Sequence, residues 1–144
     1  VGMFPHGAQG IRGIEDLFGN IWQFVDGMNF KDNQAYVNYN SETYEVDKFD
    51  GDYFRIGYLN AKTDDFITHL GYDYENFLIS FPTSVGGEDK MHITDYYYQA
   101  IGNHIAVVGG AYIIGTSAGL WCWSFNELSS TTWFRIGARL LRYA

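Results

Sequence analysis

The side chains that most often perform catalysis or bind metals are scattered through this chain of 144 residues. His6, His69, His92 and His104 lie far apart and lack the close spacing that metal-binding histidines share. The single cysteine, Cys122, stands in an apolar stretch, where we expect a small buried hydrophobic residue. It has no partner for an internal disulfide or a Cys-based zinc site. No Gly-x-Ser-x-Gly elbow or phosphate-binding loop occurs, so we expect no enzymatic activity.

Acidic side chains gather at expected turns, where a solvated carboxylate is the ordinary outcome. Carboxylate and amide oxygens are the ligands that calcium prefers, but the spacing here does not match an EF-hand loop. We therefore expect no cofactor and keep calcium as an open alternative. The residues that could form such a site, or pair as acids, are Asp26, Asp32, Asn33, Asp50, Asp52, Asp64 and Asp65.

The overall charge excludes several classes of partner. The 17 acidic and 9 basic residues give a formal net charge of −8. Binding to nucleic acid or to anionic lipid needs an electropositive surface, so we expect neither. The apolar runs are too short for membrane insertion, and the first ten residues lack the basic flank and apolar stretch of a signal peptide. We expect one domain over residues 1–144. The missing initiator Met leaves open that the chain is part of a longer protein.

Charge and aromatic residues are unevenly distributed. Residues 96–144 contain three arginines and one acid, Glu127, a net charge of +2, so residues 1–95 carry −10. Aromatic residues make up 19% of the chain, and those left on a surface provide rigid contact area at low entropic cost. The last 49 residues are therefore the best candidate for a binding surface. The alternative is a core that simply prefers aromatic side chains.

Short strands dominate the expected elements. Alternating apolar residues predict strands over residues 21–30, 34–38, 52–59, 104–108, 119–125 and 133–141, with a hairpin turn at 31–33 and a loop at 84–90. Apolar spacings of three and four residues predict a short helix over Ile93–Ile101, and residues 11–18 fit one turn of helix. Strands of this length with one or two helices and long loops predict an α+β fold with mostly antiparallel pairing.

Three segments together resemble a known family. They are Gly13-Ile14-Glu15-Asp16-Leu17-Phe18-Gly19-Asn20-Ile21-Trp22-Gln23-Phe24, then Gly109-Gly110-Ala111-Tyr112, and finally Ile136-Gly137-Ala138-Arg139-Leu140. Their order is similar to that in C-type lectin-like folds of the formylglycine-generating-enzyme variety. The stretch from Gly109 to Arg139 also resembles the variable region of proteins diversified by retroelements in phages, archaeal viruses and bacteria. Residues 30–100 resemble nothing that we can name.

The resemblance implies a C-type lectin-like fold with a variable region over about residues 109–139. Trp22, Gly109, Gly110, Gly137 and Arg139 would belong to the scaffold. The exposed positions between these motifs would form the diversified ligand-contact surface. Carried over position by position, the expected contact residues are Tyr112, Ile113, Ile114, Ser117, Trp121, Trp123, Glu127, Thr131, Trp133 and Arg135.

Two of these residues leave an alternative open. Trp121 and Trp123 share one face of the expected strand, opposite Leu120 and Cys122, so one of the two faces must point into the core.

The enzyme relatives use a cysteine pair and copper, which the lone Cys122 cannot replace. Gln23 stands where relatives have a glutamate that helps to bind calcium, and this weakens the case for that metal.

The function that the resemblance implies is receptor binding by a surface or tail protein of a phage or archaeal virus, or by a cell-surface relative. Its partner would be a host cell-surface protein or a glycan, and the domain would be located outside the cell or on the virion. Such modules are often homo-oligomeric, which raises the strength of attachment by avidity. The alternatives are a calcium-dependent carbohydrate-binding lectin and a structural virion protein.

Overall fold

The computed structural model describes residues 17–57, 59–72, 80–90 and 92–138. The described residues are 42% strand and only 8% helical, so the expected α+β class with a C-type lectin-like arrangement is wrong. The helical segments are two short 3₁₀ turns, η1 (Ser41–Thr43) and η2 (Tyr112–Ser117). The strands are β1 (Trp22–Lys31), β2 (Gln34–Val37), β3 (Phe54–Arg55), β4 (Asp65–Tyr72), β5 (Ser80–Val85), β6 (Tyr96–Gln99), β7 (Asn103–Val108), β8 (Trp123–Glu127) and β9 (Ile136–Gly137).

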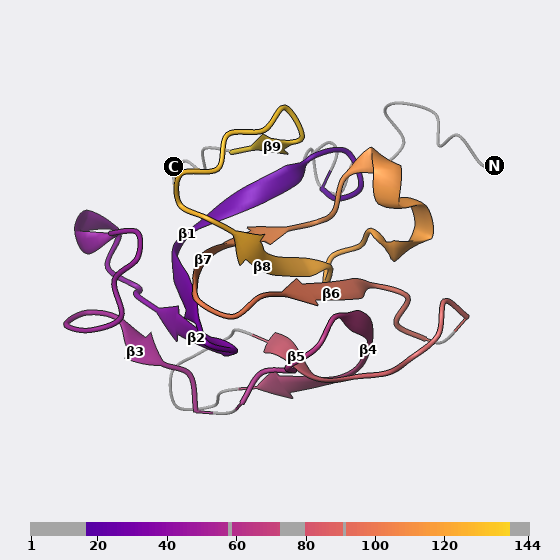
Figure 1. The fold of residues 1–144 in the computed structure, drawn as a ribbon, viewed down its shortest axis with the longest axis horizontal. Helices are drawn as coiled ribbons and strands as arrows, with labels where there is room; N and C mark the ends of the chain where they lie inside the picture. The colour runs from indigo at the N-terminus through magenta and orange to yellow at the C-terminus, as the bar shows by residue number, and fades with distance from the viewer. Residues whose placement is uncertain (1–16, 58, 73–79, 91, 139–144) are drawn as a thin grey trace, which may run out of the picture.

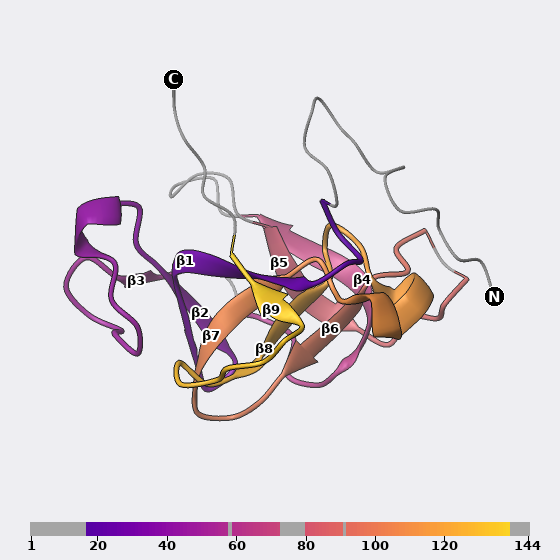
Figure 2. The ribbon, with the colours of Figure 1, turned by 90° about the horizontal axis from the view of Figure 1, so that it is seen from above.

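The strands form one curled, mixed sheet (Figure 1). Its order is β3-β2-β1-β7-β8-β6-β4-β5, and β9 pairs with β1 outside this path. Most pairs are antiparallel, as expected, but β6 pairs with β8 and β9 with β1 in parallel. Viewed from above, β9 lies close to β1 near the middle of the molecule (Figure 2). The segment that contains β9 therefore lies beside the start of β1.

The first hairpin is confirmed and shows how local sequence fixes the turn. Asp32 and Asn33 both have positive φ angles, 48° and 66°. This conformation matches the right-handed twist of a two-residue hairpin, and Asn and Asp adopt it more easily than other residues with side chains. Lys31 pairs with Gln34 directly across the turn. The strand expected at 104–108 is confirmed as β7.

The helix expected over Ile93–Ile101 is wrong, because this segment contains strand β6. Tyr97 is fully buried, whereas Tyr96 and Tyr98 are half-buried on the opposite face. That alternation has the period of a strand. Pairing with β4 and β8 on its two sides satisfies the backbone of the segment. The tertiary pairing thus outweighs the helical spacing of Tyr97 with Ile101.

Three expected strands are shorter than the apolar runs that indicated them. Within the described part of the run 52–59, which leaves out residue 58, the strand comprises only Phe54–Arg55. β8 begins at Trp123 rather than Gly119, because residues 119–122 form a turn. β9 contains two residues of the run 133–141, whose last three residues also lie outside the described part. The same holds for most of the helical turn expected at 11–18.

Aromatic packing forms the centre of the core. The rings of Phe30 and Phe125, both fully buried, stack with their centroids 4.3 Å apart. Phe81 and Trp123 pack edge to face at 4.8 Å beside them. A second, smaller cluster contains Trp22, Val107, Ala111 and Cys122. Much of the aromatic content therefore fills the core, although a separate set of aromatic side chains remains exposed.

The position of Phe125 predicts a large loss of stability on truncation. Phe125→Ala should lower the free energy of unfolding by about 3–5 kcal/mol, because it removes stacking and leaves a cavity. Leu128→Ala is the control: Leu128 is 53% exposed, and its truncation should change stability by less than about 0.5 kcal/mol. Urea unfolding of both variants measures the difference. Equal effects would contradict this description of the core.

Candidate functional site

Three segments far apart in the sequence meet at the start of β1. The backbone N–H of Trp22 donates to the carbonyl of Arg135 over 2.8 Å, and that of Tyr112 donates to Asn20 over 3.0 Å. Gly19 donates to the carbonyl of Gly109 over 2.9 Å. Backbone hydrogen bonds from one short segment therefore hold both η2 and the residues before β9.

Two glycines permit this close approach. Gly110 has a φ of +74°, and a Cβ there would lie 2.7 Å from Cβ of Ala118. A Cβ on Gly137 would lie 2.6 Å from Cδ1 of Ile21. A side chain at Gly110 would force apart the two pieces of chain that pack there, whereas at Gly137 only the tip of the Ile21 side chain would have to move. Trp22 is a buried anchor beneath the site and contacts the Tyr98 ring edge to face at 5.9 Å, whereas Arg139 lies outside the described residues.

Arg135 is the centre of an aromatic cluster on the outside of the protein. Its guanidinium carbon lies 4.8 Å from the ring centroid of Phe134, 5.0 Å from that of Trp133 and 5.8 Å from that of Tyr112. All three distances fall within the range of cation–π attraction. The first two rings belong to neighbouring residues, but Tyr112 comes from η2, more than twenty residues earlier. The guanidinium thus joins two separate segments of the surface.

The side chains of this cluster are largely open to solvent. Tyr112 is 60% exposed, Trp133 41% and Phe134 74%. Ile113, beside Tyr112, is 49% exposed, and Arg135 is half-buried. We call these five residues the aromatic face. Phe134 was not among the contact residues expected from the sequence. Its position between Trp133 and Arg135, after a polar Ser/Thr run, was the available signal.

The other expected contact residues divide between the surroundings of the face and the interior. Ile114 is half-buried and packs against the smaller core cluster. Ser117 is half-buried at the end of η2. Glu127 lies half-buried at the end of β8, opposite Ile105 of β7. Thr131 closes a turn, since its Oγ1 accepts a hydrogen bond of 3.1 Å from the N–H of Leu128. No ring contact within the described residues links any of these four to the aromatic face.

The two tryptophans of the 119–125 run differ clearly in their exposure to solvent. Trp123 is only 9% exposed and makes ring contacts with Phe81 and Phe125, so it is part of the core. Trp121 is 40% exposed in the turn before β8. Because β8 begins at Trp123, the period-two relation between these two residues does not hold. Trp121 makes no ring contact with the aromatic face among the described residues.

Asp95 fixes the turn that carries Trp121. Its Oδ2 accepts a hydrogen bond of 2.6 Å from the backbone N–H of Trp121. Gly119 passes so close to this carboxyl group that a Cβ there would clash with it. Burial raises the pKa of the Asp95 carboxyl above its ordinary value, although hydrogen bonds from Trp121 and Cys122 oppose the shift. Asp95 therefore holds the backbone of the exposed Trp121 in place.

Among the residues that the structure describes, those with metal-binding or nucleophilic chemistry do not gather at this site. Burial, followed by the nearby Asp95, raises the pKa of the Cys122 thiol to about 12, which keeps it protonated and unreactive near neutral pH. Within residues 17–57, 59–72, 80–90 and 92–138, no three His, Cys, Asp or Glu side chains are placed to share a metal ion. The side-chain amide of Gln23 donates a 3.0 Å hydrogen bond to the carbonyl of Leu17.

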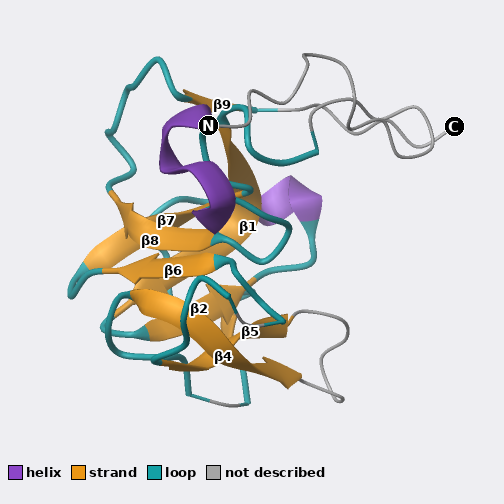
Figure 3. Ribbon diagram, turned by 90° about the vertical axis from the view of Figure 1, so that its right-hand side faces the viewer, coloured by secondary structure: helices purple, strands orange, loops and turns teal. Residues whose placement is uncertain are grey.

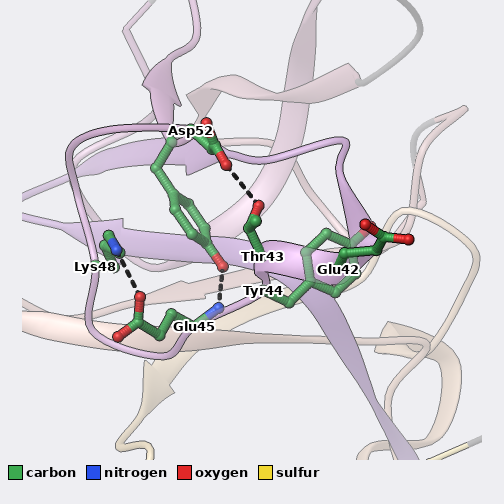
Figure 4. A pocket seen from close by; sticks show the side chains of 7 residues that line it. Glu42, Thr43, Tyr44, Glu45, Lys48 and Asp52 are labelled. Carbon is green, nitrogen blue, oxygen red and sulfur yellow. Dashed lines mark hydrogen bonds and ion pairs between the residues drawn. The ribbon is translucent and has the colours of Figure 1, made fainter.

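A shallow pocket lies elsewhere, in the acidic loop around η1 (Figure 4). Its polar groups largely satisfy one another. Lys48 forms an ion pair of 2.6 Å with Glu45, and the hydroxyl of Thr43 donates to Asp52 over 2.6 Å. The hydroxyl oxygen of Tyr53 accepts a 2.8 Å hydrogen bond from the backbone N–H of Glu45. These contacts stabilise the loop, so the pocket is a weaker candidate than the aromatic face.

Comparison with protein families, curated proteins and solved structures finds no match to this chain. In the described part of the chain, no helix has both the length and the apolar character needed to cross a membrane. The two 3₁₀ turns, drawn in purple, are the helical segments beside the orange strands (Figure 3). The aromatic face is therefore assigned as the candidate site from its own geometry and chemistry.

The raised pKa of Asp95 predicts a pH dependence of stability. Folding favours the protonated form of the Asp95 carboxyl. The stability that this group contributes is therefore fully present below its ordinary pKa of 3.8, and it is lost as the pH rises through the higher pKa of the folded state. Asp95→Asn cannot titrate, so the stability of the wild type relative to this variant should fall as the pH rises above 3.8. Urea unfolding of both proteins from acid to neutral pH measures this difference. A constant difference, or one that grows with pH, would contradict the assignment.

Proposed function

We propose that this chain is a ligand-binding domain and that the aromatic face is its contact surface. The observation that supports this proposal most strongly is the guanidinium of Arg135 within 6 Å of three exposed aromatic rings. Arginine, tryptophan and tyrosine are the residues most enriched among those that dominate binding energy at protein interfaces. The aromatic face contains all three types.

The exposure of these residues argues against a purely internal stabilising role. Burial of a large apolar side chain contributes about 1.5–3 kcal/mol to folding, and an exposed one forgoes much of that gain. Phe134 is 74% exposed and Tyr112 is 60% exposed, yet they lie together around one cation. An exposed apolar cluster of this kind is typical of an interaction site.

The backbone around the face is already ordered, which favours binding. Hydrogen bonds from Tyr112 to Asn20 and from Trp22 to Arg135 fix the two segments, and the N–H of Ile136 closes a turn on the carbonyl of Trp133 over 3.0 Å. A contact surface that is ordered before binding loses less conformational entropy when its ligand arrives. The curled sheet supplies the rigid support for these segments (Figure 1).

The ligand that we favour is a protein on the surface of a host cell. Stacked aromatic rings suit sugars as well, but the aliphatic Ile113 in the same face suits an apolar protein contact better. The setting in the proposal, an extracellular or virion-surface module that attaches a virus to its host, comes from the resemblance of residues 109–139 to retroelement-diversified proteins. Oligomerisation would then strengthen weak single contacts by avidity.

The proposal predicts that truncation of Trp133 weakens attachment without unfolding the domain. The experiment screens purified domain against arrays of extracellular proteins and glycans and then measures Kd for each hit by surface plasmon resonance. Trp133→Ala should raise Kd about thirtyfold, which corresponds to about 2 kcal/mol at an interface position of this kind. Circular dichroism should show an unchanged fold.

Ile101→Ala is the matched control, because Ile101 is 78% exposed in the turn between β6 and β7 and belongs to no part of the face. This variant should bind within about twofold of the wild type, as neutral surface substitutions do. Hits that bind Trp133→Ala as tightly as the wild type, but lose affinity for Ile101→Ala, would show that the contact surface lies elsewhere. If the domain bound another subunit of its own virion and nothing on the arrays, the structural alternative would replace receptor binding.

A genomic observation tests the diversification part of the proposal by itself. A second copy of the DNA that encodes residues 109–139, differing at adenines and located beside a reverse transcriptase gene, would support it. The absence of such a copy would remove diversification and leave the binding surface to the affinity measurements.

A further inference from the structure

The guanidinium of Arg135 has no acidic partner in the described part of the chain. Its Nε is buried, with no hydrogen-bond partner. The ion pair found among the described residues joins Lys48 to Glu45, in the acidic loop around η1. A buried donor without an acceptor costs free energy, but a buried Nε is also closed to a ligand, so the hydrogen-bonding capacity that a ligand can use is that of the two Nη groups.

The aromatic contacts of Arg135 leave that capacity in place. Ring quadrupoles attract the positive charge, but the faces of Tyr112, Trp133 and Phe134 offer none of the oxygen acceptors that a guanidinium bonds most strongly. Arginine carries five N–H donors in a planar fork that matches the two oxygens of a carboxylate. The group that would complete the site is therefore an anion with planar, paired oxygens.

The acidic net charge of the chain does not by itself exclude an acidic ligand, because the sequence segment that contains the aromatic face is not acidic. Residues 96–144 contain a single acid, Glu127, and carry a net charge of +2, whereas the remaining −10 belongs to residues 1–95. At physiological ionic strength, exposed charges more than about 8 Å apart are largely screened. The charges nearest to the ligand therefore dominate, and Arg135 belongs to the aromatic face itself.

We propose that the aromatic face recognises an Asp or Glu side chain of a partner protein that stands next to an apolar or aromatic side chain. This inference rests on the proposed function and adds the chemistry of the ligand. The carboxylate pairs with the guanidinium of Arg135, while the neighbouring apolar group packs on Trp133, Tyr112 and Ile113. The aliphatic contact offered by Ile113 favours a protein source over an acidic sugar.

Matched peptides test this inference by NMR titration of isotope-labelled protein. The probes are acetyl-Leu-Glu-Phe-amide, acetyl-Leu-Gln-Phe-amide and acetyl-Leu-Lys-Phe-amide, with sialyllactose as the acidic sugar. The readouts are the indole N–H of Trp133 and the Nε–H of Arg135. The Glu peptide should bind about three- to tenfold more tightly than the Gln peptide, because a charge-assisted bond replaces a neutral one. The Lys peptide should bind most weakly.

Substitution of the arginine separates charge recognition from apolar contact. In Arg135→Gln, the preference for Glu over Gln should disappear, while the shifts at Trp133 caused by the Phe side chain persist. Arg55→Gln is the matched control, since Arg55 is exposed on the edge strand β3, and it should keep the full preference.

Two results would overturn the inference and leave the proposed function standing. One is equal affinity for the three peptides, which would show that the aromatic face does not discriminate between acidic, neutral and basic side chains. The other is tighter binding of sialyllactose than of the Glu peptide, which would assign the carboxylate to a sugar. A third result, no shift of the Trp133 resonance with any peptide, would overturn the inference without deciding the proposed function. The proposed function is then decided by the comparison of Trp133→Ala with Ile101→Ala.

Discussion

The surface described here depends on one short segment of backbone at the start of β1. Residues 19–22 donate to Gly109 and Arg135 and accept from Tyr112, so one stretch of chain fixes two others that are far apart in the sequence. The parallel pairing of Trp22 with Ile136 continues this arrangement into the sheet. Without these bonds, η2 and the residues before β9 would be two unconnected loops. With them, a tyrosine and an arginine more than twenty positions apart share one cluster.

The aromatic residues of the core and those of the aromatic face have two different physical roles. Phe30, Phe125 and Trp123 are buried and make ring contacts that hold the sheet together. Trp133 and Phe134 are exposed and contact a cation instead. A fixed cation with aromatic neighbours provides both apolar area and a charged hydrogen-bond donor within one small surface. This combination gives a binding site its affinity and its ability to discriminate between ligands.

Sequence patterns predicted the elements whose structure is decided locally. The hairpin at Asp32 and Asn33 follows from the backbone preferences of these two residues. The short apolar run of β7 indicated a strand, which then pairs with β1 and β8. The fold class was wrong because segment 93–101 pairs on both sides within the sheet, and that pairing outweighs its helical spacing. The separation of Trp121 from Trp123 depends on where β8 begins. The clustering of Tyr112 with Arg135 depends on tertiary contacts, so spacing alone could not reveal it.

The most direct measurement of the central claim is a nuclear Overhauser experiment on the side chain of Arg135. If the aromatic face exists as described, the δ protons of Arg135 show cross-peaks to the ring protons of Tyr112 and Trp133 and are shifted upfield by the ring currents. Cross-peaks to Tyr112 are decisive, because this residue is distant in the sequence and its ring centroid lies 5.8 Å from the guanidinium carbon. Resonances at ordinary positions, with no cross-peaks to Tyr112, would contradict the account.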